Sequence, residues 1–179
     1  MPDAGATLEF TECSVVISKS DGDAIPLVSR VSATVAAGRI LAVMGPSGAG
    51  KTTLLGLLAG KPGSGGEVRY GSVWLNGQSV SADSYKRHCV LVSQFDRLWT
   101  FLTPYEQLRY AMMLYQPDLP SADRRAAILQ LLSDTGLSAC QDTRTGTNTA
   151  LEIPITGLSG GQRRRLSLAL ALTKKPSVL

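Results

Sequence analysis

The chain has 179 residues, 44% of them hydrophobic and 6% aromatic, and its formal net charge is +4. This length suits one domain with a buried aliphatic core, and the absence of any apolar run of about 18 residues or of a signal-peptide pattern argues against a membrane span or a secretion signal. The one basic cluster is Arg163–Arg165. A solvated helix face, or a contact with phosphate or a partner domain, explains it more simply than nucleic acid does.

From residue 8 to about residue 80 the sequence shows strand patterns separated by turns. In one of them, apolar residues alternate with polar ones, at Val31, Ala33 and Val35. Another, Val73–Leu75, leads directly into Asn76-Gly77, a dipeptide that favours a hairpin turn because both residues tolerate positive φ. We therefore expect an antiparallel β-layer in this part of the chain.

Residues 39–60 combine a strand pattern, a glycine-rich turn and a helix pattern. The apolar run Ile40–Met44 is short and bounded by glycines, which predicts a buried parallel strand over residues 39–44. The residues that follow fit the P-loop pattern: Gly45, Pro46, Ser47, Gly48, Ala49, Gly50, Lys51 and Thr52. A helix then runs to Gly60, which favours a left-handed C-cap.

This order places the backbone N–H groups of Gly48, Ala49, Gly50 and Lys51 at a helix N-terminus, where they can surround a polyphosphate. Lys51 is then expected to reach the β- and γ-phosphates, and the Thr52 hydroxyl to ligate Mg²⁺. We include Thr53 in the same nucleotide-binding segment. The alternative, a glycine-rich turn with a surface lysine, is disfavoured because the motif and its context agree.

Residues 96–157 have a helical pattern. Thr103 and Glu106 form a capping box, with Pro104 starting a helix whose apolar face is Leu108, Ala111, Met112 and Tyr115. A second helix begins near Ser121 and ends at Gly136, with a buried face made of Ala127, Ile128, Leu131 and Leu132. The polar stretch 143–149 predicts a surface loop. The cysteines, Cys13, Cys89 and Cys140, have no zinc or CxxC spacing and predict reduced thiols used in packing.

A second glycine-rich helix start occurs at Leu158, Ser159, Gly160, Gly161 and Gln162. Ser159 and Gln162 fit a capping box, which is a purely structural role. Two glycines in the first turn, however, cost about 1 kcal/mol each relative to alanine. Their presence makes sense where a ligand approaches the backbone, and a helix N-terminus suits phosphate. Both interpretations stay open at this point.

Together these motifs resemble the nucleotide-binding domain of an ABC transporter, from about Leu8 to Leu179. In this resemblance residues 45–52 are the Walker A loop, and residues 158–162 are the signature that closes over ATP held by a second domain. Gln94, after the strand-like run 88–92, is similar to the Q-loop glutamine, whose amide touches Mg²⁺ or the attacking water. The resemblance therefore implies catalytic roles for Lys51 and Gln94, and Mg²⁺ contacts for Thr52 and Gln94.

The stretches 91–96, 102–108 and 157–167 are similar to the white-type G subfamily of half-transporters. The family's adenine-stacking aromatic is replaced by Val15, and the subfamily usually has Glu where this chain has Gln162. The chain also stops before the Walker B aspartate and the catalytic glutamate of the family. We therefore expect an incomplete domain that binds ATP and lacks the hydrolytic residues.

The implied fold is α/β, a P-loop NTPase with a RecA-like parallel core, an antiparallel β-layer and an inserted helical subdomain, truncated at its C-terminus. As a single domain over 1–179, it would comprise core and β-layer at 1–95, helical subdomain at 96–157, and signature helix with the start of the Walker B strand at 158–179.

The implied function is the ATP-binding subunit or domain of a transporter, which couples ATP binding and hydrolysis to transmembrane transport. ATP and Mg²⁺ are the expected cofactors. The expected partners are a second nucleotide-binding domain, identical or not, and a transmembrane domain of the full-length protein, at the cytoplasmic face of a membrane, with no nucleic acid. One alternative is a soluble ABC-type ATPase acting on nucleic acid or ribosomes; another is a module that only holds ATP.

Overall fold

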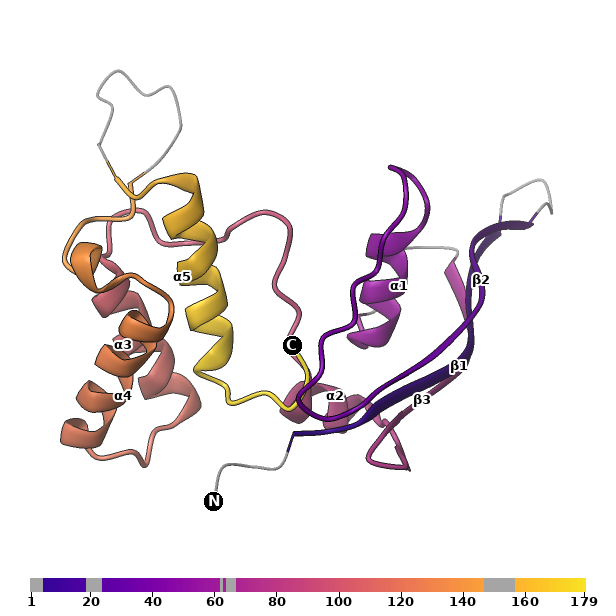
Figure 1. The fold of residues 1–179 in the computed structure, drawn as a ribbon, viewed down its shortest axis with the longest axis horizontal. Coiled ribbons are helices and arrows are strands. Elements are labelled where there is room, and N and C mark those ends of the chain that lie inside the picture. Colours follow the sequence, from indigo (N-terminus) through magenta and orange to yellow (C-terminus); the bar gives the residue numbers. More distant parts are fainter. Residues whose placement is uncertain (1–4, 19–23, 62, 64–66, 147–156) are drawn as a thin grey trace. The chain divides into compact units, whose positions relative to one another are not determined.

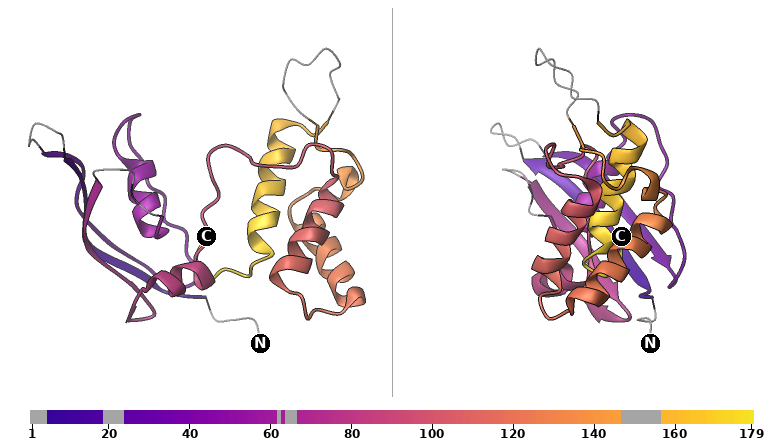
Figure 2. Two further views of the ribbon diagram at one scale, coloured as in Figure 1. Left: turned by 180° about the vertical axis from the view of Figure 1, so that it is seen from behind. Right: turned by 90° about the vertical axis from the view of Figure 1, so that its left-hand side faces the viewer.

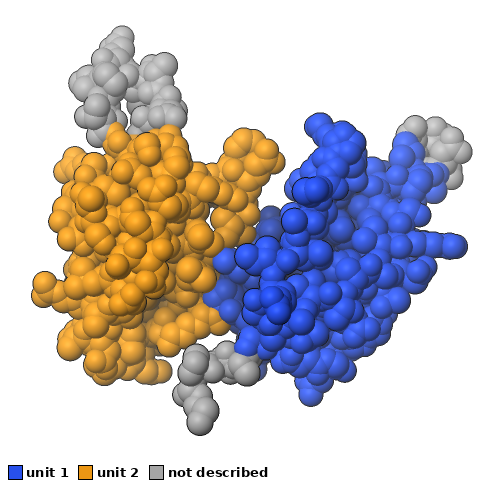
Figure 3. All heavy atoms as spheres, in the orientation of Figure 1, with its two compact units in different colours: residues 1–91, 176–179 blue, residues 92–175 orange. Residues whose placement is uncertain are grey.

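The computed structural model describes residues 5–18, 24–61, 63, 67–146 and 157–179. The chain divides into two compact units, residues 1–91 with 176–179, and residues 92–175 (Figure 3). Each unit has a core of its own. Among the helices formed by these described residues, none combines the length and the apolar character needed to cross a membrane.

The first unit is an antiparallel sheet with a helix on one face (Figures 1 and 2). Its elements are β1 (Leu8–Ser18), β2 (Ala24–Val35), α1 (Lys51–Leu58), β3 (Glu67–Leu75), β4 (Gln78–Ser79) and α2 (Ala82–His88). The strand order is β2-β1-β3-β4. The core is formed by Leu8, Phe10, Cys13, Val15, Val28, Leu54, Leu57 and Leu58. Burial of this apolar face holds α1 against the sheet.

Two predictions for the sheet are confirmed. Val31, Ala33 and Val35 pack against the core from β2, as their alternation indicates. Asn76 and Gly77 both have positive φ, 51° and 75°, and join β3 to β4 as a tight hairpin.

A bulge in β1 changes which residues face the core. Leu8 and Phe10 are buried, and after the bulge Cys13 and Val15 are buried, so the inward positions change from even to odd numbers. The pairing with β2 shifts register between Phe10 and Cys13, and Glu12 has a φ of 52°. One extra residue resets the two-residue period.

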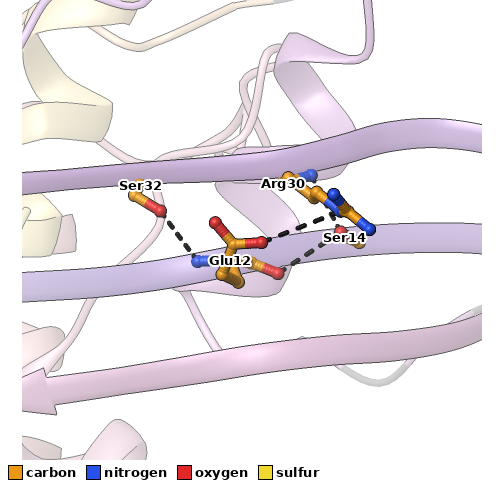
Figure 4. A network of polar contacts seen from close by, with 4 residues as sticks. All are labelled: Glu12, Ser14, Arg30 and Ser32. Atoms are coloured by element: carbon orange, nitrogen blue, oxygen red, sulfur yellow. Dashed lines mark hydrogen bonds and ion pairs between the residues drawn. The ribbon is translucent and has the colours of Figure 1, made fainter.

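Serine side chains supply the hydrogen bonds at this irregularity (Figure 4). The Glu12 N–H donates to Ser32 Oγ at 2.8 Å, and the Arg30 N–H donates to Ser14 Oγ at 2.8 Å. Ser14 Oγ in turn donates to the Glu12 carbonyl at 3.3 Å. An exposed ion pair between Arg30 and Glu12, at 3.8 Å, adds little to stability because water screens it. The serines thus satisfy backbone groups that the sheet ladder leaves unpaired.

The expected buried strand over residues 39–44 is wrong. The segment has no regular structure, and Ile40 and Met44 are 97% and 87% exposed. A parallel strand of this kind requires neighbouring strands and covered faces, and the described sheet consists of β1–β4 alone. Val43 is the residue of this segment that packs against the core.

The strand expected at residues 88–92 is also absent. His88 ends α2, and Cys89 forms a single parallel bridge with Val178. The Val90 N–H donates to the Val178 carbonyl at 3.0 Å. Strand formation requires repeated pairing along the segment, and here the pairing is restricted to one bridge.

The second unit is a small helical cluster of α3 (Pro104–Tyr115), α4 (Ser121–Asp134), the 3₁₀ helix η1 (Ser138–Cys140) and α5 (Gly160–Leu172). The predicted capping box of α3 is present, with Thr103 and Glu106 bonding each other's backbone N–H at 2.9 and 3.2 Å. The end of α4 is also as predicted, with Gly136 at a φ of 64°. The helices enclose Leu108, Met112, Ile128, Leu132, Leu137, Cys140, Leu158, Leu166 and Ala169.

Two predictions for this unit are wrong. Tyr115 is 51% exposed instead of buried, and its ring lies under Lys174, whose Nζ is 4.5 Å from the ring centroid. The attraction between the Lys174 ammonium group and the face of the Tyr115 ring stabilises the ring in this exposed position. Thr145 is fully buried although it lies in a polar stretch, while residues 147–149 of that stretch lie outside the described residues.

Thr145 is buried because its hydroxyl joins three segments. Its Oγ1 accepts a hydrogen bond from Gln107 Nε2 at 2.7 Å and donates to the Leu102 carbonyl at 2.8 Å. Gln107, also buried, bonds the backbone N–H and carbonyl of Trp99. This polar network is satisfied and ties α3 to the loops on either side.

The three thiols are free, as predicted. Cys13 and Cys140 are buried in the two cores, and Cys89 is half-buried. Burial raises the pKa of the Cys13 thiol, and a hydrogen bond from the Thr11 backbone opposes this only in part. Burial also raises the pKa of Cys89. Thiols of this kind stay protonated at neutral pH and act as small apolar groups.

We expect Gly71→Ala to destabilise the first unit more than Gly77→Ala. Both glycines have positive φ, 96° and 75°. A Cβ at Gly71 would lie 2.7 Å from Cys13 Cα, opposite the bulge, whereas a Cβ at Gly77 would meet no atom within 4 Å. At Gly77 the backbone strain of a positive φ should lower the free energy of unfolding by about 1 kcal/mol. At Gly71 the same strain together with the steric overlap should lower it by about 3 kcal/mol. Urea unfolding of the two variants measures the difference; equal losses would contradict the overlap.

We expect Thr145→Val to lower the free energy of unfolding by about 2 kcal/mol, because the isosteric side chain leaves a buried hydrogen-bonding network incomplete. Thr143→Val is the matched control, since Thr143 is exposed. The control should change stability by less than about 0.5 kcal/mol. Thermal unfolding followed by circular dichroism compares the two variants. If Thr145→Val has the same free energy of unfolding as the wild type, the network adds no stability.

Candidate functional site

The glycine-rich loop between β2 and α1 presents an uncapped helix N-terminus. Gly50 is the N-cap residue of α1, with left-handed φ and ψ of 81° and 6° and no side-chain capping bond. Gly48 has a φ of 82°. The first turn of α1 contains no acidic residue. The N–H groups at this end therefore keep the positive end of the helix dipole available for an anion.

Gly50 also packs tightly against β2. A Cβ on Gly50 would overlap the Leu27 carbonyl oxygen and lie 3.1 Å from Val28 Cγ2. Only glycine fits this approach, which seats the start of α1 on the sheet. By contrast, a Cβ on Gly48 would meet nothing within 4 Å, so this part of the loop faces open space.

Lys51 folds back over the loop. Its Nζ donates to the carbonyl oxygens of Gly45 and Pro46, at 2.8 and 2.6 Å. The Ala49 N–H donates to the Pro46 carbonyl at 3.3 Å. Of the four N–H groups expected to face a phosphate, that of Ala49 is therefore used inside the loop.

Thr52 and Thr53 occupy the first turn of α1, where Thr52 is exposed and Thr53 half-buried. The first backbone bond into the helix is donated by Leu54 N–H to the Gly50 carbonyl, at 2.9 Å. The N–H groups of the preceding first-turn residues have no intrahelical acceptor by helix geometry. Backbone donors, the Lys51 ammonium and a threonine hydroxyl thus come together, a donor set that fits a polyphosphate with Mg²⁺.

The end of α1 has the left-handed glycine cap expected there. Gly60 has a φ of 63°, its N–H donates to the Leu57 carbonyl, and the Lys61 N–H donates to the Gly56 carbonyl, each at 3.0 Å. These two bonds form a Schellman motif. The carbonyl groups at the C-terminal end of α1 are therefore capped by backbone hydrogen bonds, whereas the N–H groups at its N-terminal end have no side-chain cap.

The second glycine-rich segment forms the start of α5, in the second unit. Ser159 Oγ accepts from the Gln162 N–H at 3.2 Å, and Gln162 Oε1 accepts from the Ser159 N–H at 2.8 Å, which confirms the capping box. Leu158 is buried in the helical core. The structural role of Ser159 and Gln162 is therefore established.

Gly160 and Gly161 lie in the first turn of α5 and are exposed. A Cβ on Gly160 would meet no atom within 4 Å, and one on Gly161 would be in ordinary contact with Arg165 Nη1 at 3.5 Å. Packing within the described chain therefore does not require either glycine. Both glycines cost helix stability relative to alanine, so the described packing does not account for their presence.

Gln94 lies in an exposed bend of the second unit, whereas Lys51 and Thr52 belong to the first. Among the described residues its side-chain amide has no hydrogen-bond partner. The described residues also contain no group of three or more His, Cys, Asp or Glu side chains able to hold a metal ion.

The basic cluster makes specific contacts that the sequence did not indicate. Arg163 Nη1 donates to the Leu158 carbonyl at 2.8 Å, which supports the backbone just before α5. Arg164 and Ser167 contact Asp96, at a sequence separation of 71 residues for Ser167. Periodicity and spacing carry no signal for a contact at that separation; only the folded arrangement reveals it.

Comparison with known proteins agrees with these two motifs. The family model described as ABC transporter matches residues 28–179. The chain is 36% identical over 154 residues to ABC transporter G family member 1 of Dictyostelium discoideum, covering 86% of this chain and 19% of that protein. It is 37% identical over 173 residues to ABC transporter G family member STR2 of Medicago truncatula, covering 97% and 23%.

ABC transporter G family member 7 of Arabidopsis thaliana is 39% identical over 155 residues, which cover 86% of this chain and 20% of that protein. The chain thus spans about a fifth to a quarter of the length of these relatives. The family match covers both glycine-rich helix starts and the segment around Gln94. The chain therefore belongs to the ABC transporter family, and the relatives it resembles are members of its G family.

Proposed function

We propose that this chain is an ATP-binding part of a G-type ABC transporter, in which ATP binding and hydrolysis drive transport. The observation that carries the proposal is the open N-terminus of α1, with a left-handed Gly50, no acid in its first turn, and Lys51 beside it. ATP supplies the phosphoryl group whose transfer to water releases free energy, and Mg²⁺ neutralises its charge.

Lys51 holds the loop and the nucleotide together. An ammonium group has three N–H donors, and in the structure two of its bonds go to the Gly45 and Pro46 carbonyls. The third donor and the full positive charge are available to the β- and γ-phosphates. The remaining loop residues, Ser47, Gly48 and Ala49 among them, form the wall of the cradle, and Thr53 continues it into the helix.

Thr52 and Gln94 are the proposed Mg²⁺ contacts. The Thr52 hydroxyl is exposed at the open end of α1, and the Gln94 amide is exposed in its bend. Both offer oxygen, the ligand type that Mg²⁺ prefers. Gln94 also serves, in this proposal, to orient the attacking water, and Lys51 stabilises the charge that develops on the phosphates.

The signature residues, Leu158–Gln162, act on a nucleotide bound by a second domain. The N-terminus of α5 has no acid in its first turn, and Arg163 and Arg165 follow directly. Helix dipole and nearby guanidinium groups both favour phosphate there. The backbone of Gly160 and Gly161 is open to close approach.

The wider assembly follows from the same proposal. A second nucleotide-binding domain, identical or different, would supply the other half of each site, and a transmembrane domain would place this part at the cytoplasmic face of a membrane. Within the chain we propose a RecA-like core with its β-layer over residues 1–95 and a helical subdomain over 96–157. Residues 158–179 would hold the signature helix and the start of the Walker B strand.

We expect Lys51→Ala to weaken Mg·ATP binding by about tenfold or more, because it removes a charge-assisted hydrogen bond to phosphate. Lys61→Ala, which removes the same charge at the opposite end of α1, should bind as the wild type does. Isothermal titration calorimetry measures both. The proposal fails if the wild-type chain gives no heat of binding with Mg·ATP, or if the two variants bind equally.

We expect Gly160→Ala to stabilise α5 by up to about 1 kcal/mol, because alanine is the better helix former and the methyl group meets no atom of the chain. The same methyl group should weaken ATP-dependent association of two chains, since it occupies the surface offered to the partner's nucleotide. Ser133→Ala, on the exposed surface of α4, is the control. It should leave association unchanged in analytical ultracentrifugation, and unaltered association of Gly160→Ala would refute the role of the signature.

A further inference from the structure

The bend that carries Gln94 is attached to α5 on both sides of the glutamine. Before it, Arg164 Nη1 donates a hydrogen bond to the Ser93 carbonyl. After it, Ser167 Oγ donates to Asp96 Oδ1 at 2.7 Å, and Arg164 Nη1 lies 3.5 Å from the same oxygen. All of these residues belong to the second unit. One helix therefore fixes the two ends of a four-residue segment.

The geometry concentrates these contacts on one carboxylate oxygen. Arg164 and Ser167 are three residues apart in α5, so their side chains project from the same face of the helix. Asp96 presents Oδ1 to both of them, and its side chain is only 21% exposed. The bond from Ser167 to the ionised carboxylate is charge-assisted, and Arg164 adds an ion pair to the same oxygen, at a residue that is exposed as a whole. The contact is thus able to order the bend.

Gln94 itself takes no part in these contacts. It is exposed, and within the described residues its amide has no partner. The backbone on either side is held while the functional group between the anchors is left free.

We infer that Asp96 is a positioning residue, which Arg164 and Ser167 hold so that the Gln94 amide is presented to Mg²⁺ of bound ATP. This inference rests on the proposed function, because it takes Gln94 as a Mg²⁺ contact. It adds a residue role to that function. Asp96 does not touch the nucleotide; it acts through the bend.

The test compares the affinity of the chain for ATP with Mg²⁺ and for ATP in EDTA, by calorimetry. The ratio of the two affinities isolates the contribution of the metal contact. Gln94→Ala should reduce this ratio, and Asp96→Ala should reduce it by a similar factor, about fivefold to tenfold, the loss expected for one hydrogen bond to a charged group. The double variant should lose no more than either single variant, because both act on one contact.

Two further variants separate positioning from a general loss of structure. Asp96→Asn keeps an oxygen acceptor for Ser167 and should restore most of the ratio. Asp118→Ala, which removes an exposed acid from the turn after α3, should leave it unchanged. Amide hydrogen exchange over residues 93–98 gives a readout independent of nucleotide: exchange should be faster in Asp96→Ala than in the wild type or in Asp118→Ala.

The outcomes distinguish a failure of the Asp96 role from a failure of the proposed ATP-binding function. If the wild type does not bind ATP at all, the proposed function is wrong and the role of Asp96 falls with it. If the wild type binds Mg·ATP more tightly than ATP alone and Asp96→Ala keeps the same ratio, the positioning role alone is overturned. Unchanged exchange over residues 93–98 would also overturn it, since the bend would then not depend on this anchor.

Discussion

The close approach of Gly50 to β2 is the constraint on which the nucleotide-binding geometry depends. A Cβ on Gly50 would overlap the Leu27 carbonyl oxygen, so no side chain fits there. The same glycine is the N-cap of α1 and has a left-handed conformation, so a side chain at this position would be strained as well as crowded. The packing of Leu54, Leu57 and Leu58 on the sheet then holds the helix in place. An anion site made of backbone requires that rigidity, because backbone donors cannot be reoriented by rotamer changes.

Local chemistry explains which elements could be predicted from sequence. The capping boxes at Thr103 and Ser159, the Asn76-Gly77 hairpin and the glycine cap at Gly60 each depend on a few neighbouring residues. The hydrogen bonds and backbone conformations that form them involve residues close together in the sequence, so the local sequence pattern is enough to predict them. The glycine-rich turn and the helix pattern after it likewise sufficed to place Lys51 at a helix N-terminus, although the strand expected before the turn is absent.

The failures depend on distant partners. The run Ile40–Met44 has the composition of a buried strand, but a strand forms only beside another strand, and the described residues offer it none. Thr145 is polar and lies in a turn-rich stretch, yet Gln107 and the Leu102 carbonyl make its burial favourable. Membership of the ABC transporter family implies the P-loop NTPase fold, whereas the parallel pairing found among the described residues is a single bridge between Cys89 and Val178.

Both glycine-rich segments form the N-terminus of a helix, but the glycines are there for different reasons. At α1 the glycine is required by the protein itself, because Gly50 has a neighbour that excludes a side chain. At α5 a Cβ on Gly160 would meet no described atom within 4 Å, so packing does not account for the glycine there. Ser159 and Gln162 cap the helix without needing those glycines. The proposed role of the two glycines, close approach of a nucleotide held by a second domain, is consistent with a helix that is already capped and still carries two glycines in its first turn.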